Sequence, residues 1–213
     1  LLLIYKTLMA LLLPVLIIRL LIRSIRDSSY RLNLPERLAF FSNDTSADIW
    51  IQAVSLGEVR ASAELVESLL KAFPKSKVLI TSTTPSGSAE VRRLFGDRVK
   101  HSLMPYDSTL VVRSALSQIC PKAVILIETE IWPVLLEELG KRGIPSFLVN
   151  GRMSSKSAIG YLRFAALTKY LFGYLDTVYA QYESDRDNFI SLGVQPESVK
   201  LMGNLKFDSS LPR

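Results

Sequence analysis

An α/β fold, with a doubly wound parallel sheet preceded by an apolar N-terminal membrane helix, is the architecture that this sequence predicts. Its body alternates short apolar runs with segments of helical periodicity, the pattern of a parallel sheet covered by helices on both faces. Polar or glycine-containing clusters follow the runs, as expected of loops at strand ends. With 213 residues, 48% of them hydrophobic, the chain can bury one full core.

The N-terminal 28 residues are predicted to anchor the chain in a membrane. Most of them are Leu and Ile, and arginines follow the apolar block, whereas a cleaved signal peptide has its cationic region first. The uncharged stretch Thr7–Ile18 is shorter than a bilayer span requires, but Lys6 and Arg19 can extend it by snorkelling. Spanning the bilayer and lying in its interface therefore both stay open, as does a buried helix in a larger assembly. The arginines place the following domain in the cytoplasm.

Residues 29–208 are predicted to form one domain, whose strands are short apolar runs bounded by turn residues. These runs are Ile49–Ser55, Val78–Thr81, Val99–Met104, Ala123–Ile127, Ser146–Asn150, Thr177–Ala180 and Val199–Met202. Nearly continuous apolar runs are typical of parallel strands that are buried on both faces.

The segments between these runs have the spacing of amphipathic helices. After the first run, apolar residues recur every three or four positions at Val59, Ala63, Val66, Leu70 and Phe73. The other predicted helices are Pro85–Phe95, Ser108–Cys120, Pro133–Arg142, Lys156–Phe172 and Glu183–Leu192. Such spacing places the apolar residues of each helix on one stripe that can pack on the sheet.

Polar clusters occur directly after successive runs. They are "SLGE", "STTPSG", "ETEIWP", "NGRMS", "QYESD" and "GNLKFD". Because parallel strands all end at the same edge of a sheet, these clusters are expected to line one rim. Open α/β sheets bind their ligands at that rim, so it is the predicted site.

The first cluster leaves two roles open for Glu58. The spacing Ser55-x-x-Glu58 matches a capping box, in which both side chains bind orphan amides of a helix's first turn. Gly57 is a costly residue in that turn, but it lets a substrate approach the backbone closely. Glu58 is thus either a helix cap or a proton acceptor, and its local spacing favours the cap.

Two further clusters carry candidate ligand-binding groups. Thr84 is the predicted N-cap of the helix that begins at Pro85, and its open amides, with Ser86 beside them, can receive an anion. A plain capped helix is the alternative. Glu128 and Glu130 are two positions apart on a predicted strand end, hence on one face and about 7 Å apart. Repulsion and burial would raise the pKa of at least one, unless one simply caps the next helix.

Basic residues gather in the second half of the chain. Arg152 and Lys156 belong to a stretch from Gly151 to Gly173 without acidic residues, and this stretch can face phosphates, a membrane or only solvent. Lys206 follows the last apolar run and can reach the rim, although a lone lysine is ordinarily solvated.

The composition excludes several kinds of chemistry. With one cysteine and one histidine, the chain has no internal disulfide, no thiolate-cluster zinc site and little support for a serine triad. The Asp-x-Asp of Asp185 and Asp187 lies in a predicted helix, where the two side chains diverge, so no metal site is assigned. A net charge of +6 suggests anionic partners without choosing among nucleic acid, phosphorylated substrates and membrane.

The motifs, taken in order, resemble those of the 3-deoxy-D-manno-octulosonic acid (Kdo) transferases. They are "AVSLGE", "TSTTPSGS", "PYD", "ETEIWP", "VNGRMSSKSAIGY", "AQYESDRDNFISLG" and "GNLKFD". The resemblance implies a glycosyltransferase of the GT-B type, with two Rossmann-like domains, that transfers Kdo from CMP-Kdo to a lipid A precursor. It also implies the cytoplasmic face of the inner membrane, no cofactor or metal, and no nucleic acid.

The resemblance further implies roles for individual residues. Glu58 would be the general base, while Glu130 and Lys206, with Glu128 as possible support, would stabilise the transition state. The residues assigned to acceptor binding are Gly57, Arg60, Thr84, Ser86, Arg152 and Lys156.

The chain departs from the family pattern in residues and in length. Gly151, Met153 and Leu56 stand where the family has Ala, Leu and Val. Such enzymes carry a second, C-terminal domain that binds most of the donor, and that domain is expected to be absent from this chain. The chain would then be an acceptor half without activity of its own. A competing hypothesis is a non-catalytic, membrane-tethered module that binds an anionic lipid or glycan.

Overall fold

The computed structural model describes residues 1–26, 34–41 and 44–205. Its strands are β1 (Ile49–Gln52), β2 (Val78–Ser82), β3 (Lys100–Leu103), β4 (Ala123–Ile127), β5 (Ser146–Gly151), β6 (Thr177–Ala180) and β7 (Val199–Leu201). Each predicted run overlaps one of these strands, and β2 and β5 each extend one residue beyond their runs. The first strand ends before its run does, because Ser55 already caps the following helix.

The strands form one parallel sheet in the order β3-β2-β1-β4-β5-β6-β7. Trp50 of β1 lies opposite Leu79 of β2 on one side and Val124 of β4 on the other. The chain thus builds the sheet outward from β1 to β3 and then restarts at β4, on the other side of β1. This is the predicted doubly wound fold, and its topological switch point lies between β1 and β4.

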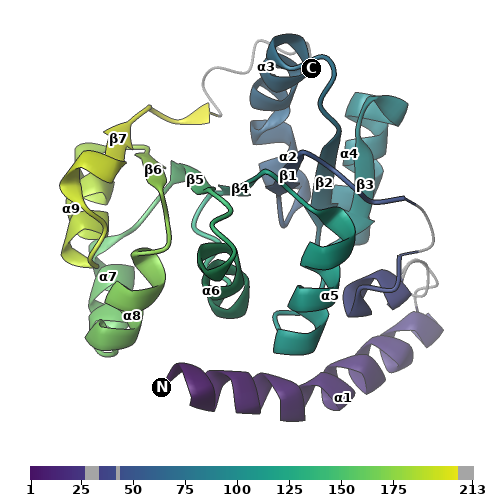
Figure 1. Cartoon of the computed structure of the whole chain (residues 1–213), viewed down its shortest axis with the longest axis horizontal. Coiled ribbons are helices and arrows are strands. Elements are labelled where there is room, and N and C mark those ends of the chain that lie inside the picture. The colour runs from purple at the N-terminus through teal and green to yellow at the C-terminus, as the bar shows by residue number, and fades with distance from the viewer. Residues whose placement is uncertain (27–33, 42–43, 206–213) are drawn as a thin grey trace.

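Helices cover both faces of the sheet (Figure 1). One face carries α2 (Leu56–Ala61), α3 (Ala63–Ala72) and α4 (Pro85–Phe95), and the other carries α5 (Thr109–Ile119), α6 (Pro133–Lys141), α7 (Ser155–Leu162), α8 (Ala165–Phe172) and α9 (Glu183–Ser191). Within β4, Ile125 packs in the first layer and Val124 and Leu126 in the second. The alternation of side chains along a strand therefore produces two cores from one apolar run.

Two of the predicted helices are each divided in two. The stripe from Val59 to Phe73 breaks at Ser62, whose buried hydroxyl donates to the carbonyl oxygen of Val59 at 3.0 Å. The segment Lys156–Phe172 breaks at Phe164, whose φ of −121° and ψ of 43° are not helical. Apolar periodicity does not detect such breaks, because the apolar stripe continues across them.

Helix α1 (Leu2–Arg26) precedes the sheet, and short 3-10 helices lie at Leu34–Leu38, Gly96–Arg98 and Pro196–Ser198. In α1, the stretch Leu2–Ile25 is long and apolar enough to cross a membrane, and only 6% of its most apolar 18 residues is buried. The predicted apolar N-terminal helix is therefore present. Its attachment to a membrane stays a prediction.

Candidate functional site

The switch point brings the loops after β1 and β4 next to each other. β1 and β4 are paired in parallel, so Ala53–Glu58 and Glu128–Trp132 leave the sheet at the same edge. Glu58 and Glu130 are close enough for the charge of Glu58 to raise the pKa of Glu130. The rim predicted from the polar clusters therefore exists here, and it joins two carboxylates that are far apart in the sequence.

Glu58 both caps helix α2 and faces this rim. The Ser55 hydroxyl accepts a hydrogen bond from the Glu58 N–H at 3.4 Å and donates one to the Glu58 carboxylate at 3.0 Å. The other carboxylate oxygen accepts from the N–H of Val54 at 2.7 Å. Glu58 is 8% exposed. These bonds fix the orientation of the carboxylate, and a carboxylate that accepts hydrogen bonds can also accept a proton. Cap and proton acceptor are thus compatible roles.

Glu128 and Glu130 lie in a loop, so the strand geometry predicted for them is wrong. β4 ends at Ile127, and Glu128 has a φ of +60°, in the left-handed region. The Glu128 N–H still donates to the carbonyl oxygen of Val149 at 2.9 Å, after which the chain leaves the sheet. The two carboxylates nevertheless remain close enough for the charge of Glu128 to raise the pKa of Glu130.

Glu130 has the perturbed pKa that the sequence predicted for this pair. Burial first, then the charges of Glu58 and Glu128, raise the pKa of Glu130 from 4.5 to about 7. The nearby Trp132 indole lowers the pKa of Glu130 and so opposes part of this rise. Its buried N–H makes no hydrogen bond of good geometry with the described residues. Glu130 can therefore take up or release a proton near neutral pH.

Thr129 ties the loop of the carboxylates to the loop after β5. Its hydroxyl donates to the carbonyl oxygen of Arg152 and accepts from the Arg152 N–H at 3.1 Å. The Arg152 side chain is exposed beyond this link, as is Lys156 in the first turn of α7. Thr129 is a positioning residue that the sequence analysis missed, since nothing in its local pattern indicates a bond across the rim.

The helix α4 begins as predicted. The hydroxyl of Thr84 accepts from the Gly87 N–H at 3.1 Å, and Pro85 occupies the first turn. The Ser86 hydroxyl is exposed and donates to Thr84 at 3.3 Å. The cap is therefore confirmed, and an anion at this helix end stays a prediction.

Gly57 is exposed in the first turn of α2, directly before Glu58. A Cβ at this position would meet only the Ser55 hydroxyl, at 3.8 Å, which is ordinary van der Waals contact. Packing within the described protein therefore does not require glycine here. Access of a substrate to the backbone at this position stays a prediction.

Arg60 forms an ion pair within the protein, although its side chain is 58% exposed. Its guanidinium donates to Glu90 on α4 at 2.6 Å, and Arg93 binds the same carboxylate at 2.8 Å. Hydrogen bonds from Arg93 and then Arg60 lower the pKa of the buried Glu90 to about 2. This ion pair joins α2 to α4, so the structure favours a structural role for Arg60 over the predicted acceptor contact.

Arg37 is a second residue that the sequence analysis missed. It is buried, it lies in the 3-10 helix Leu34–Leu38, and its guanidinium donates to the carbonyl oxygen of Thr83 at 2.6 Å. It thereby supports the loop that carries Thr84. No sequence motif pointed to it, because the contact joins segments more than forty residues apart.

Lys206 and the Asp-x-Asp of Asp185 and Asp187 are the remaining residues discussed from the sequence. Lys206 lies outside the described residues. Within the described part of the chain, no three His, Cys, Asp or Glu side chains gather in a way that could hold a metal ion. Asp185 instead accepts hydrogen bonds from the N–H groups of Met153, at 2.8 Å, and Tyr182, at 3.2 Å.

Sequence comparison gives a consistent set of relatives. The family described as 3-deoxy-D-manno-octulosonic-acid transferase (kdotransferase) matches residues 32–209. A 3-deoxy-D-manno-octulosonic acid transferase of Haemophilus influenzae is 33% identical over 188 residues, covering 87% of this chain and 44% of the relative. The transferase of the same name from Bordetella pertussis is 39% identical over 175 residues, covering 78% and 39%. The chain spans less than half the length of these relatives.

Comparison of folds finds sugar-nucleotide enzymes. The UDP-GlcNAc 2-epimerase of Neisseria meningitidis, solved with UDP-GlcNAc, superposes with a TM-score of 0.56 over 75% of this chain and 47% of that one. The identity is 16%, so this likeness concerns the fold alone.

Proposed function

The chain belongs to the 3-deoxy-D-manno-octulosonic acid transferase family, and from that membership we propose that it is the acceptor-binding part of a Kdo transferase. The complete enzyme transfers Kdo from CMP-Kdo to a lipid A precursor in lipopolysaccharide synthesis. The observation that carries the proposal is the group of Glu58, Glu128 and Glu130 at the switch point of the sheet. A fixed carboxylate beside a carboxyl of raised pKa is suited to accept a proton from a sugar hydroxyl.

Glu58 acts as the general base. It takes the proton of the acceptor hydroxyl while that oxygen bonds to the anomeric carbon of Kdo. The bond from this carbon to the CMP phosphate breaks, and its electron pair leaves with CMP, so the configuration inverts. The hydrogen bonds from Val54 and Ser55 support this role, because they hold the carboxylate in one orientation.

Glu130 supports the transition state through its charge. Positive charge grows on the anomeric carbon as CMP departs, and a nearby carboxylate stabilises it. With a pKa raised to about 7, Glu130 changes its charge near neutral pH, and its ionised form is the stabilising one. Glu128 raises this pKa and so adjusts the fraction that is ionised.

Phosphate groups engage the remaining candidates. Thr84 and Ser86 at the N-terminus of α4, together with Arg152 and Lys156, receive the phosphates of the acceptor. Lys206 neutralises the departing CMP phosphate. Most of the CMP-Kdo binds to a C-terminal domain, as the partial coverage of the relatives supports. The enzyme uses no metal or cofactor and works at the cytoplasmic face of the inner membrane, attached through α1.

The test compares full-length wild-type protein with Glu58→Gln and, as a matched control, Glu64→Gln on the neighbouring helix α3. Each is incubated with CMP-Kdo and lipid A precursor, and products are identified by mass. We expect Glu58→Gln to lose turnover by at least about a thousandfold with its fold intact, since general-base catalysis contributes up to about 10⁴-fold. Glu64→Gln should retain activity.

Equal turnover by wild type and Glu58→Gln would refute the proposed base. If the wild type itself makes no product but binds anionic lipid, the chain is instead a non-catalytic membrane-tethered module. Turnover by residues 1–213 alone would refute the two-domain organisation.

A further inference from the structure

Helix α1 lies along the domain over its whole length. Its less exposed residues recur every three or four positions, which places them on one stripe of the helix. They are Leu2, Tyr5, Lys6, Met9, Leu13, Leu16, Ile17, Leu20 and Ser24. Tyr5 and Leu13 pack against the core, and the charge of Arg19 acts on Tyr106 in the loop after β3. The helix therefore runs across the domain instead of projecting from it (Figure 1).

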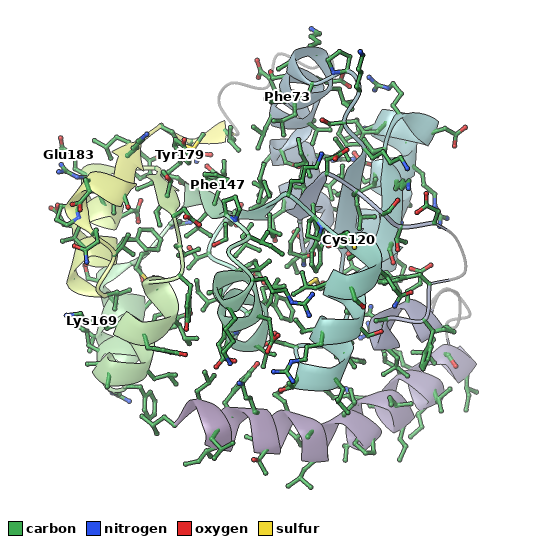
Figure 2. All side chains as sticks on the ribbon, viewed as in Figure 1. Phe73, Cys120, Phe147, Lys169, Tyr179 and Glu183 are labelled. Atoms are coloured by element: carbon green, nitrogen blue, oxygen red, sulfur yellow. The ribbon has the colours of Figure 1, made fainter. Side chains whose placement is uncertain are left out.

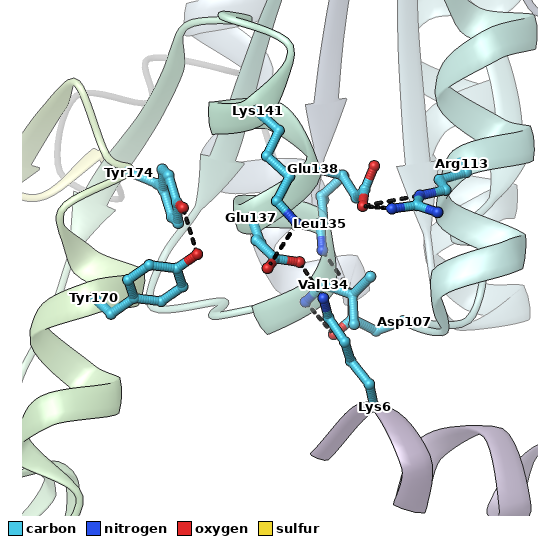
Figure 3. A network of polar contacts seen from close by, with 10 residues as sticks. All are labelled: Lys6, Asp107, Arg113, Val134, Leu135, Glu137, Glu138, Lys141, Tyr170 and Tyr174. Carbon is cyan, nitrogen blue, oxygen red and sulfur yellow. Dashed lines mark hydrogen bonds and ion pairs between the residues drawn. The ribbon is translucent and has the colours of Figure 1, made fainter. Parts of the chain in front are cut away.

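A polar cluster fastens the N-terminal part of α1 to the domain (Figure 3). The Tyr5 hydroxyl donates to Asp107 at 2.9 Å, and Lys6 forms an ion pair with the buried Glu137 of α6. Asp107 is 1% exposed and also accepts from the N–H groups of Val134 and Leu135 at 3.0 and 2.9 Å. Asp107 thus caps α6 and holds α1 through the same carboxylate.

This attachment is incompatible with α1 crossing a bilayer. Lys6 and Ser24 are 18 residues apart, which is about 27 Å along a helix and close to the thickness of the hydrocarbon core. In a spanning helix Lys6 would lie at the interface opposite to the domain. It would then be out of reach of Glu137, with which it pairs in this structure.

The outward face of α1 is apolar. Its large residues are 39% to 77% exposed, namely Leu3, Ile4, Leu8, Leu11, Leu12, Val15, Ile18, Leu21, Ile22 and Ile25. Figure 2 shows side chains of α1 that extend away from the domain along its lower edge. Thr7 is the one polar residue on this face before Arg19, and its hydroxyl donates to the carbonyl oxygen of Leu3 at 3.0 Å. Arg19 and Arg23 lie exposed near the end of the helix.

We propose that α1 lies flat in the interface of an anionic membrane, with its outward face in the acyl region, and that it does not cross the bilayer. An exposed apolar face followed by arginines matches lipid chains bordered by anionic headgroups. The proposal rests on the membrane location given above and specifies its geometry.

The flat orientation places the membrane beside the candidate site. Asp107 follows β3 at the same rim of the sheet, and α6, which it caps, begins shortly after Glu130. A lipid-linked acceptor can therefore present its sugar to the rim while its acyl chains stay in the bilayer.

Depth measurements on the full-length protein test this orientation. Single cysteines replace Leu3, Leu11 or Ile22 in a background lacking Cys120 and any other cysteine, and each carries a fluorophore. The protein is bound to vesicles of phosphatidylethanolamine and phosphatidylglycerol that contain nitroxide lipids labelled at different depths. A flat helix predicts the same shallow depth at all three positions. A spanning helix predicts that Leu11 is deep and that the two ends are shallow, which would refute the proposal.

Cross-linking in membranes supplies a second measurement. Lys6→Cys paired with Glu137→Cys should be joined by a short bismaleimide, whereas the control pair of Ile18→Cys with Glu137→Cys should not. Absence of the first cross-link refutes the attachment. Failure to bind vesicles, together with normal turnover of a short-chain acceptor, refutes the membrane geometry while leaving the proposed transferase intact.

Discussion

Replacing Gly57 by alanine separates the needs of folding from those of function. The new methyl group would contact only the Ser55 hydroxyl, at 3.8 Å, and Gly57 is the second residue of α2. Replacing glycine by alanine at a compatible helical position stabilises a protein by about 0.4–1 kcal/mol. For a domain of this size, that corresponds to an increase in Tm of about 1–4 °C.

The same methyl group should impair catalysis. It occupies the exposed surface directly beside Glu58, where the proposed mechanism brings the acceptor sugar. Displacing the acceptor by about 1 Å can cost up to about a hundredfold, and we expect kcat/KM to decrease at least about tenfold. Stability is measured by denaturant unfolding of residues 1–213, and activity with the full-length protein, CMP-Kdo and lipid A precursor.

Gly160→Ala is the matched control. Gly160 lies in α7, and a Cβ there would meet no atom within 4 Å, so this variant should gain stability without losing activity. Unchanged turnover in Gly57→Ala would refute the assignment of Gly57 to substrate access. A loss of stability would refute the packing argument itself.

Other variants test the rest of the rim. In wild type, kcat/KM should rise with pH through about 7 as Glu130 ionises, and Glu130→Gln should lack this inflection. Folding raises this pKa from 4.5 to about 7, so the free energy of unfolding of the wild type should decrease as the pH rises through this range. Denaturant titrations at pH 5 and pH 8 should show this decrease in the wild type and not in Glu130→Gln. Thr129→Val removes both bonds to the Arg152 backbone and should lower stability by about 1 kcal/mol and also lower kcat, whereas a Thr129→Ser control should retain both. Arg60→Gln should lower stability, because Arg60 pairs with the buried Glu90, and should leave KM for the acceptor within about twofold. Arg152→Gln should instead raise KM for the acceptor by about tenfold or more, because removal of a hydrogen bond to a charged group costs at least about 1.5 kcal/mol. A raised KM for Arg60→Gln would restore its predicted acceptor contact.

The sequence determined the sheet and the edge at which its polar loops gather. Apolar runs such as Ala123–Ile127 and the cap at Thr84 are local patterns. A parallel strand buried on both faces must be apolar along its length, and a helix end needs a residue that can satisfy its amides, so both can be recognised in a short stretch of sequence. The family motifs point to Glu58 and Glu130 from the sequence alone, without their distance. Local periodicity did not detect the helix break at Phe164, because an apolar stripe continues across it.

Tertiary structure alone decided how these residues meet. Which strands pair is set by packing across the whole sheet, so only the fold places the loop of Glu58 beside that of Glu130 and raises the pKa of Glu130. The same holds for the engagement of Arg60 by Glu90 and for the bond between Thr129 and Arg152. The composition of α1 is equally compatible with spanning a bilayer and with lying on it. Its orientation depends on contacts with Asp107 and Glu137, which lie more than a hundred residues away in the chain.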